Sequence, residues 1–216
     1  MSPARLAWEP RVPPEARAGV LKLLAASVRD DAMLGLIRGP TAAEGRAWLD
    51  GLDEDLSEGR THLLLARAGE GEDVLGLLCL DPARLATQRH LVTLRRAIVH
   101  PRARGTALLL RALERVLERC AHHGWTTLIA DVRAGTRSER LWRRLGFREY
   151  GRLDNYAHHA GRVHAGVFLT ATPEELECKL RPRIRRLSSH RPDAFGTSCA
   201  EPWNATPRST TRCSRA

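Results

Sequence analysis

One segment constrains the fold of this chain more than any other: a strongly amphipathic stretch from Arg104 to His123 that lies between two strand-like stretches. Its apolar residues recur at the spacing of one helix face, and Gly124 stands where a helix commonly ends. Residues 90–99 before it and residues 127–132 after it are largely apolar, which favours strands. A strand, a helix and a second strand in this order predict a parallel crossover and hence an α/β fold.

The rest of the chain, up to about residue 172, also alternates between helix-like and strand-like stretches. Turn residues at 68–72 and 154–161 join the strands on either side of them into two antiparallel hairpins. The further predicted helices span 14–36, 41–58 and 137–145, and the further predicted strands span 62–68, 74–80, 147–152 and 163–170.

Composition limits the class of protein. With 216 residues, 43% of them hydrophobic, the chain fills one domain and is short for two. It has no run of about 18 apolar residues, and its first residues lack the apolar core of a signal peptide. The five cysteines are scattered without a CxxC pair, which indicates neither a disulfide framework nor a metal site. We therefore expect a cytoplasmic protein that spans no membrane and holds no metal.

The net charge of +10 is concentrated near the C-terminal end. Residues 178–216 carry nine Lys or Arg and two Asp or Glu, a balance of +7, which leaves +3 for residues 1–177. The end segment has little apolar periodicity, so it cannot offset the entropy lost on ordering. We predict a domain over residues 1–177 and a basic, disordered tail over residues 178–216. Such a tail attracts nucleic acid by charge, but its aromatic side chains are few, so nucleic acid ranks last as a partner.

The start of the central helix is the first candidate binding site. A strand ends in the loop from His100 to Arg104, and Gly105 follows. The first-turn amides of a helix lack internal partners and the helix dipole is positive there, so such an opening attracts anions. Arg102 and Arg104 add positive charge. The residues alone leave two interpretations open: an anion site, or a basic turn into a helix.

Three motifs, in order, resemble the GNAT superfamily of N-acetyltransferases. The run from Val99 to Ala107, V-H-P-x-x-R-G-x-A after a strand, is similar to the acyl-CoA motif of that family, Q/R-x-x-G-x-G/A. Residues 128–132 and 134–147 are similar to its L-x-V strand and to its next helix, which ends in Gly-Phe. The order of the elements over residues 5–172 agrees with the family as well.

The resemblance implies the acyl-CoA N-acyltransferase fold: a mixed, mostly antiparallel central sheet flanked by helices, with one parallel strand pair that splays apart. It also implies acetyl-CoA as the acyl donor and direct transfer of the acetyl group to an amine. Because no cysteine falls at a plausible acceptor position, we expect no covalent enzyme intermediate. The implied cofactor contacts are the backbones of Ile98 and Val99 along the pantetheine arm, Arg104, Gly105, Thr106, Ala107 and Leu109 around the pyrophosphate, Arg102 beside them, and Trp142 at the position of a family tyrosine.

The sequence departs from the family at five positions. Ala107 and Leu109 replace smaller residues and make the phosphate loop bulkier. Trp142 replaces a tyrosine that often protonates the leaving thiolate, and an indole is no acid near neutral pH. Thr93 falls where a carboxylate is often found, and Gly135 replaces an asparagine.

Asp131 and Tyr156 are the candidate catalytic residues. Asp131 lies within an otherwise apolar strand, where it is either functional or a sheet-end carboxylate paired with Arg133 or another base. Tyr156 resembles a tyrosine found at this hairpin in GNAT enzymes that modify small molecules, including tabtoxin-resistance-like acetyltransferases; the alternative is a packed aromatic side chain. The remaining candidates, which solvation alone also explains, are His158, His159 and His164.

The predicted function is acetyl-CoA-dependent N-acetylation of a primary amine on a small molecule, such as an amino acid, an amine or an antibiotic-like compound. One alternative is a module that binds acyl-CoA without catalysis, because of the departures from the family. The other is a nucleic-acid binder that uses the tail. The sequence does not select the acceptor or the acyl-chain length, and it leaves a homodimer open.

Overall fold

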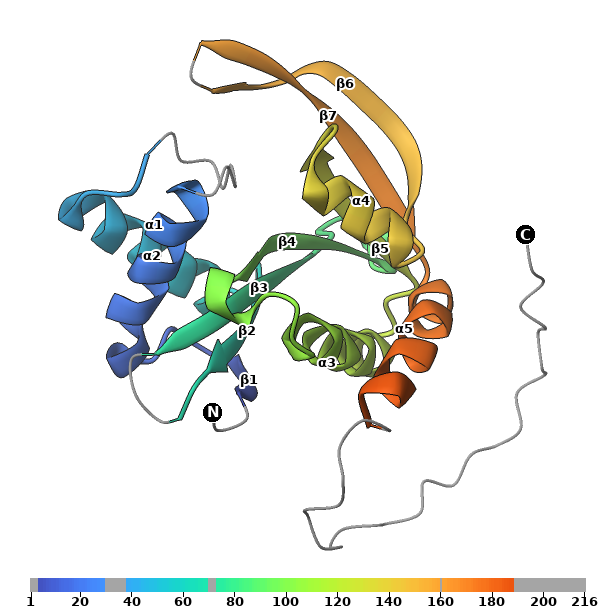
Figure 1. Cartoon of the computed structure of the whole chain (residues 1–216), viewed down its shortest axis with the longest axis horizontal. Coiled ribbons are helices and arrows are strands. Elements are labelled where there is room, and N and C mark those ends of the chain that lie inside the picture. The colour runs from blue at the N-terminus through green and yellow to red at the C-terminus, as the bar shows by residue number, and fades with distance from the viewer. Residues whose placement is uncertain (1–3, 30–37, 70–72, 160, 189–216) are drawn as a thin grey trace, which may run out of the picture.

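The computed structural model describes residues 4–29, 38–69, 73–159 and 161–188. Within this part, seven strands form one sheet in the order β1-β2-β3-β4-β5-β7-β6, and all neighbours are antiparallel except the parallel pair β4 and β5 (Figure 1). The strands are β1 (Arg5–Glu9), β2 (His62–Arg67), β3 (Val74–Pro82), β4 (Leu91–Val99), β5 (Thr127–Arg133), β6 (Arg148–His159) and β7 (Arg162–Ala171). The helices are α1 (Arg17–Arg29), α2 (Ala42–Ser57), α3 (Leu108–His123), α4 (Arg137–Arg144) and α5 (Pro173–Ser188). The predicted mixed α/β fold is confirmed.

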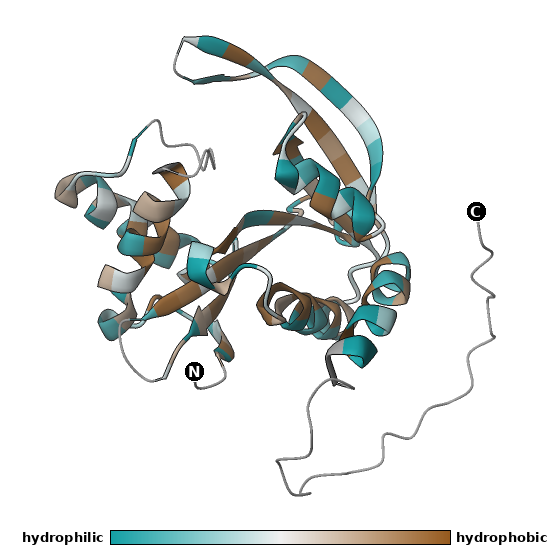
Figure 2. Ribbon diagram, in the orientation of Figure 1, coloured by the Kyte–Doolittle hydropathy of each residue, from teal (hydrophilic) through white to brown (hydrophobic). Residues whose placement is uncertain are grey.

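Helices cover both faces of the sheet (Figure 1). α1 and α2 pack on one face, over a core that includes Leu63, Leu77 and Ile98. α3 and α5 pack on the other face, over a larger core that includes Leu94 and Leu128. Figure 2 shows that the central strands are mostly hydrophobic, whereas α4 and α5 carry hydrophilic outer sides. Burial on both faces explains why β2 and β3 have nearly continuous apolar sequences.

β4 and β5 pair along only part of their length. Residues Leu91–Leu94 pair with Thr127–Ala130, and the pairing ends there although β4 continues to Val99 and β5 to Arg133. A β-bulge interrupts β4 at Arg96, which has a left-handed φ of 52°, and a bulge bends the strand that carries it. Beyond the last pair the two strands therefore separate, as expected for the splayed pair.

The central helix begins later than the sequence predicts. Pro101–Ala103 form a 3-10 turn, and Gly105 has a φ of 75°, a conformation that glycine adopts without strain. The Thr106 hydroxyl donates to a carbonyl of this turn at 2.7 Å and accepts from the Leu108 amide at 3.2 Å. The helix therefore starts at Leu108 rather than Arg104, and the predicted pyrophosphate contacts lie mainly in the loop before it.

The C-terminal hairpin is longer than the sequence predicts. β6 runs to His159 and β7 starts at Arg162, so residues 154–159 belong to a strand rather than to a loop. Figure 1 shows the hairpin reaching well past the rest of the sheet. Residues 154–156 of β6 form a bulge opposite a single residue of β7, Ala165, which interrupts the regular alternation that sequence reasoning relies on.

The expected start of the disordered tail, residue 178, was wrong. Residues 178–188 continue α5, because Leu176 and Leu180 recur at helical spacing and lie 0% and 1% exposed in the core beside α3. Three predicted segments lie outside the described residues: the tail from 189 onward, residues 30–36 of the first helix, and residues 70–72 of the first turn. Across the described residues, no helix combines the length and the apolar character that crossing a membrane needs.

Candidate active site

The loop before α3 presents an opening that is suited to an anion. Ala107 occupies the N-cap position, and no side chain there caps the helix. A helix start has several amides without intrahelical acceptors, and here the Leu108 amide is the one that the Thr106 hydroxyl satisfies. A Cβ added at Gly105 would meet no atom within 4 Å, so the loop faces open space. The start of α3 can therefore receive a phosphate group.

Two arginines bring positive charge to this opening. The Nε of Arg104 donates to the Val99 carbonyl at 3.2 Å, which holds its guanidinium at the end of β4. Burial, and then the charge of Arg137 at the start of α4, lower the Arg104 pKa. Arg102, which the sequence also predicted beside the pyrophosphate, forms an ion pair with Asp73, the residue before β3. The structure thus brings Arg104 and Arg137 together, whereas Arg102 serves a different ion pair.

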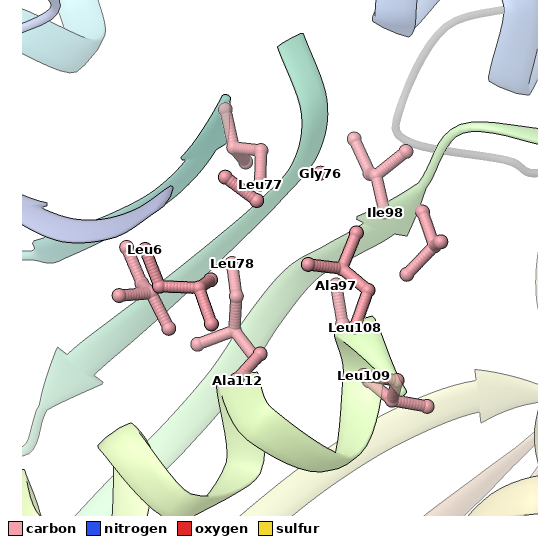
Figure 3. Close-up of a pocket in the computed structure, with 12 residues that line it drawn as sticks. Leu6, Gly76, Leu77, Leu78, Ala97, Ile98, Leu108, Leu109 and Ala112 are labelled. Carbon is pink, nitrogen blue, oxygen red and sulfur yellow. The ribbon is translucent and has the colours of Figure 1, made fainter. Parts of the chain in front are cut away.

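A small apolar pocket lies between α3 and the end of β4. Figure 3 shows Ala97 and Ile98 of β4 close to Leu108 and Leu109 of α3 around it, and the predicted contact Val99 also lines it. Its volume is about 20 Å³, enough for one water molecule. Leu109, one of the bulkier residues that the sequence places here, lines the pocket. The pocket is therefore too small to hold an acyl-CoA arm as it stands.

Asp131 and Tyr156, 25 residues apart in sequence, meet on one face of the sheet. The Tyr156 hydroxyl donates a hydrogen bond to Oδ2 of Asp131. Leu94 and Ala130 form the last β4–β5 pair and face the α3 core. Because side chains alternate along a strand, Asp131 faces the opposite side, at the point where β4 and β5 separate. The two candidate catalytic residues therefore sit at the edge of the gap between these strands.

The environment keeps Tyr156 protonated. Burial, and then the hydrogen bond and charge of Asp131, raise the pKa of the phenol above its usual value, and the charge of Arg95 opposes this in part. Arg95 is the residue of β4 that follows the last pair, as Asp131 is in β5. Its guanidinium is about half exposed and lies 3.6 Å from Asp81. The site therefore combines a carboxylate, a neutral phenol and a nearby cation.

The other candidates lie elsewhere. Trp142 is 6% exposed and packs against Phe147 with ring centroids 5.1 Å apart, so its indole belongs to the core. His158 is exposed and interacts with Asn155 at 2.5 Å. Thr93 pairs with Ile129 in the closed part of β4 and β5. Among the described residues, no group of three or more His, Cys, Asp or Glu side chains could hold a metal ion.

Sequence reasoning missed three residues that shape the site: Arg95, Arg137 and Gly166. Arg95 and Arg137 are ordinary among the many arginines of the chain, and no sequence pattern distinguishes them. Gly166 lies beneath the Tyr156 ring, where an added Cβ would come within 2.3 Å of Cγ. A glycine inside a predicted strand was the available signal, because it often marks a close approach.

Comparison with known proteins agrees with this fold. A model of the acetyltransferase (GNAT) family matches residues 31–147, more than half of the chain. Among solved structures, similar folds include an N-acetyltransferase from Staphylococcus aureus Mu50 (TM-score 0.64, 17% identity, 80% of this chain and 99% of that chain). They also include ribosomal-protein-alanine N-acetyltransferase from Brucella melitensis (0.62, 20%, 78% and 99%) and yncA from Salmonella typhimurium, solved with its cofactor acetyl-CoA (0.61, 17%, 80% and 95%). The chain belongs to the acetyltransferase (GNAT) family and is an acyltransferase.

Proposed function

We propose that the protein is an acetyl-CoA-dependent N-acetyltransferase that acts on the primary amine of a small molecule, in the manner of tabtoxin-resistance-like acetyltransferases. The observation that carries the proposal is the Asp131–Tyr156 pair at the edge of the gap between β4 and β5. The Asp131 carboxylate is a proton acceptor. It lies where the acetyl end of an acetyl-CoA molecule bound at the start of α3 would pass between β4 and β5. An amino acid, a simple amine or an antibiotic-like amine all fit this class.

The donor site follows from the unpaired end of β4 and the loop after it. Ile98 and Val99 lie beyond the last β4–β5 pair, so those of their backbone groups that point toward β5 rather than β3 can bond to a pantetheine amide. The open loop at Gly105, the uncapped helix at Ala107 and the charge of Arg104 suit a pyrophosphate. These features fit acetyl-CoA, although Leu109 is bulkier than the residue usual at this position of the family.

When bound, acetyl-CoA supplies a thioester whose carbonyl carbon forms a C–N bond with the amine as its C–S bond breaks. Asp131 takes the proton from the attacking nitrogen. Tyr156 holds the carboxylate in place through its hydroxyl, which is already engaged in that hydrogen bond. The proton that Asp131 takes from the amine is released to solvent, and solvent protonates the departing thiolate. Both cysteines of the central core are unsuited to a covalent route, because burial raises the pKa of Cys79 to about 11 and that of Cys120 to about 12.

Arg95 narrows the choice of acceptor. Asp131 attracts an ammonium group, and the half-exposed Arg95 guanidinium lies on the same face of the sheet, directly across the gap. An acceptor that carries an anionic group near its amine can contact both charges. Among small amines, we therefore favour amino acids and their analogues.

Two substitutions test the catalytic assignment. In Asp131→Asn the proton acceptor is lost, so kcat/KM should fall by about 10² to 10⁴, the usual contribution of a positioned base. Binding of acetyl-CoA should not change, because Asp131 lies on the opposite face from α3. Asp154→Asn is the matched control: it removes an exposed carboxylate two residues from Tyr156 and should leave kcat/KM unchanged. Equal activity of Asp131→Asn and the control would overturn the assignment and favour a module that only binds acyl-CoA.

A further inference from the structure

Gly166 lies in direct contact with the ring of Tyr156. A Cβ added at position 166 would lie 2.3 Å from Cγ, 2.5 Å from Cδ2 and 2.7 Å from Cβ of Tyr156. These atoms are the base of the side chain and the ring, not a flexible end that could rotate aside. Any side chain at this position would therefore displace the whole tyrosine.

The pairing of the strands explains why the ring passes over this residue. On β7, Gly166 pairs with Arg133 of β5, and Phe168, two residues further on, pairs with Asp131. Residues two apart in a strand share a face, so Gly166 lies beside Asp131 on the open face of the sheet. Tyr156 comes from β6, beyond β7, so its side chain must cross the β7 backbone to reach the carboxylate.

Two further features direct Tyr156 along this path. The bulge over residues 154–156 releases Tyr156 from regular pairing between Leu153–Gly166 and Ala157–His164. The Phe168 ring then supports the Tyr156 ring edge-on, with centroids 6.0 Å apart and planes at 88°. The bulge turns the side chain, the glycine leaves the path clear, and the phenylalanine fixes its direction.

We propose that Gly166 is a positioning residue, whose missing side chain lets Tyr156 cross β7 and hold the Asp131 carboxylate. It acts through Tyr156 and touches neither substrate. The effect on turnover rests on the proposed function, whereas the effect on Tyr156 does not.

The two tyrosines of the chain make a direct test practical. Tyr150→Phe removes the other phenol, so ultraviolet absorbance then reports the ionisation of Tyr156 alone. In this background Tyr156 should remain protonated at a pH of about 10.5, because burial and Asp131 hold its pKa above the ordinary value of about 10. Adding Gly166→Ala should release the phenol to solvent, so most of it should ionise at the same pH.

Gly151→Ala is the matched control on the same hairpin. An added Cβ there would lie 3.8 Å from Phe168, an ordinary contact, so Tyr156 should stay protonated. If Gly166→Ala fails to fold, the double variant with Tyr156→Ala should fold again, because the new methyl group then meets no ring. Unchanged ionisation of Tyr156 in folded Gly166→Ala, or a double variant no more stable than the single one, would overturn the proposal.

Turnover supplies the second readout. Gly166→Ala should lower kcat by on the order of 10²-fold, the lower end of what a positioned proton-transfer group contributes, and Gly151→Ala should not. Released Tyr156 with unchanged kcat would overturn the positioning role in catalysis. Since the absorbance titration needs no substrate, it separates failure of this proposal from failure of the proposed function.

Discussion

Reversing the charge of Arg104 should weaken acetyl-CoA binding by about two orders of magnitude. Arg104 is held at the end of β4 by its hydrogen bond to the Val99 carbonyl, and the charge of Arg137 acts on it, so its charge lies near the loop before α3. At a distance of about 6 Å and an effective dielectric constant of about 40, Coulomb's law gives about 1.4 kcal/mol for each pair of unit charges. Arg104→Glu changes the local charge by two units, which amounts to about 3 kcal/mol or a roughly 100-fold higher Kd.

Calorimetric titration with acetyl-CoA, at low and at physiological salt, measures this change. Arg115→Glu is the control, because it alters the net charge equally on an exposed part of α3 about 10 Å further along the helix axis from Leu108. Charge at that distance is largely screened at physiological salt. Equal losses in the two variants, or no loss in Arg104→Glu, would refute a pyrophosphate site at the opening.

Three further predictions concern the core and the chemistry. Cys120→Ala should retain most activity, because burial raises the thiol pKa to about 12 and leaves no thiolate for a covalent step; a folded but inactive variant would contradict direct transfer. A chain that ends at Glu177 should be about 2–5 kcal/mol less stable than one that ends at Ser188, because it lacks the buried Leu180. Urea denaturation measures the difference, and equal stability of the two chains would contradict the packing of α5. Burial, and then His123 and Arg119, lower the pKa of His62 to about 4, so stability that is full above about pH 6.5 should decline as the pH falls toward 4. Because His62 is only half buried, we expect the free energy of unfolding to fall by about 1 kcal/mol over this pH range, and we expect no such fall in His62→Phe. The same pH dependence in that variant would contradict the assignment of the effect to His62.

The order of elements was predictable, whereas several boundaries were not. The apolar face of α3 is continuous from Leu108 onward, but Arg104 and Ala107 have good helix propensity, so the pattern alone extended the helix backward. The left-handed Gly105 and the hydrogen bonds of Thr106 end that extension, and both depend on turn geometry. The second half of α5 was predicted as disordered, because several arginines separate the apolar residues of its buried side and make the segment look polar.

In the candidate site, individual residues were predictable from the sequence, but the contacts between them were not. Asp131 stood out as a charge in an apolar strand, and Tyr156 stood out by resemblance, but nothing in the sequence linked them. Their contact depends on the register of β5, β7 and β6 and on a bulge of residues 154–156, which are long-range properties. The contribution of Gly166 depends on the same register. The alternative considered for Asp131, an ion pair with Arg133, did not indicate that its Oδ2 accepts a hydrogen bond from the Tyr156 hydroxyl.

Acetyl transfer can be measured as release of free thiol from acetyl-CoA in the presence of a panel of amino acids and other primary amines, with the product identified by mass spectrometry. We expect thiol release that requires an amine and matches the N-acetylated product in amount. We also expect that Asp131→Asn binds acetyl-CoA normally but releases little thiol. Acetyl-CoA binding without amine-dependent release from the wild-type protein, or full activity of Asp131→Asn, would contradict these expectations.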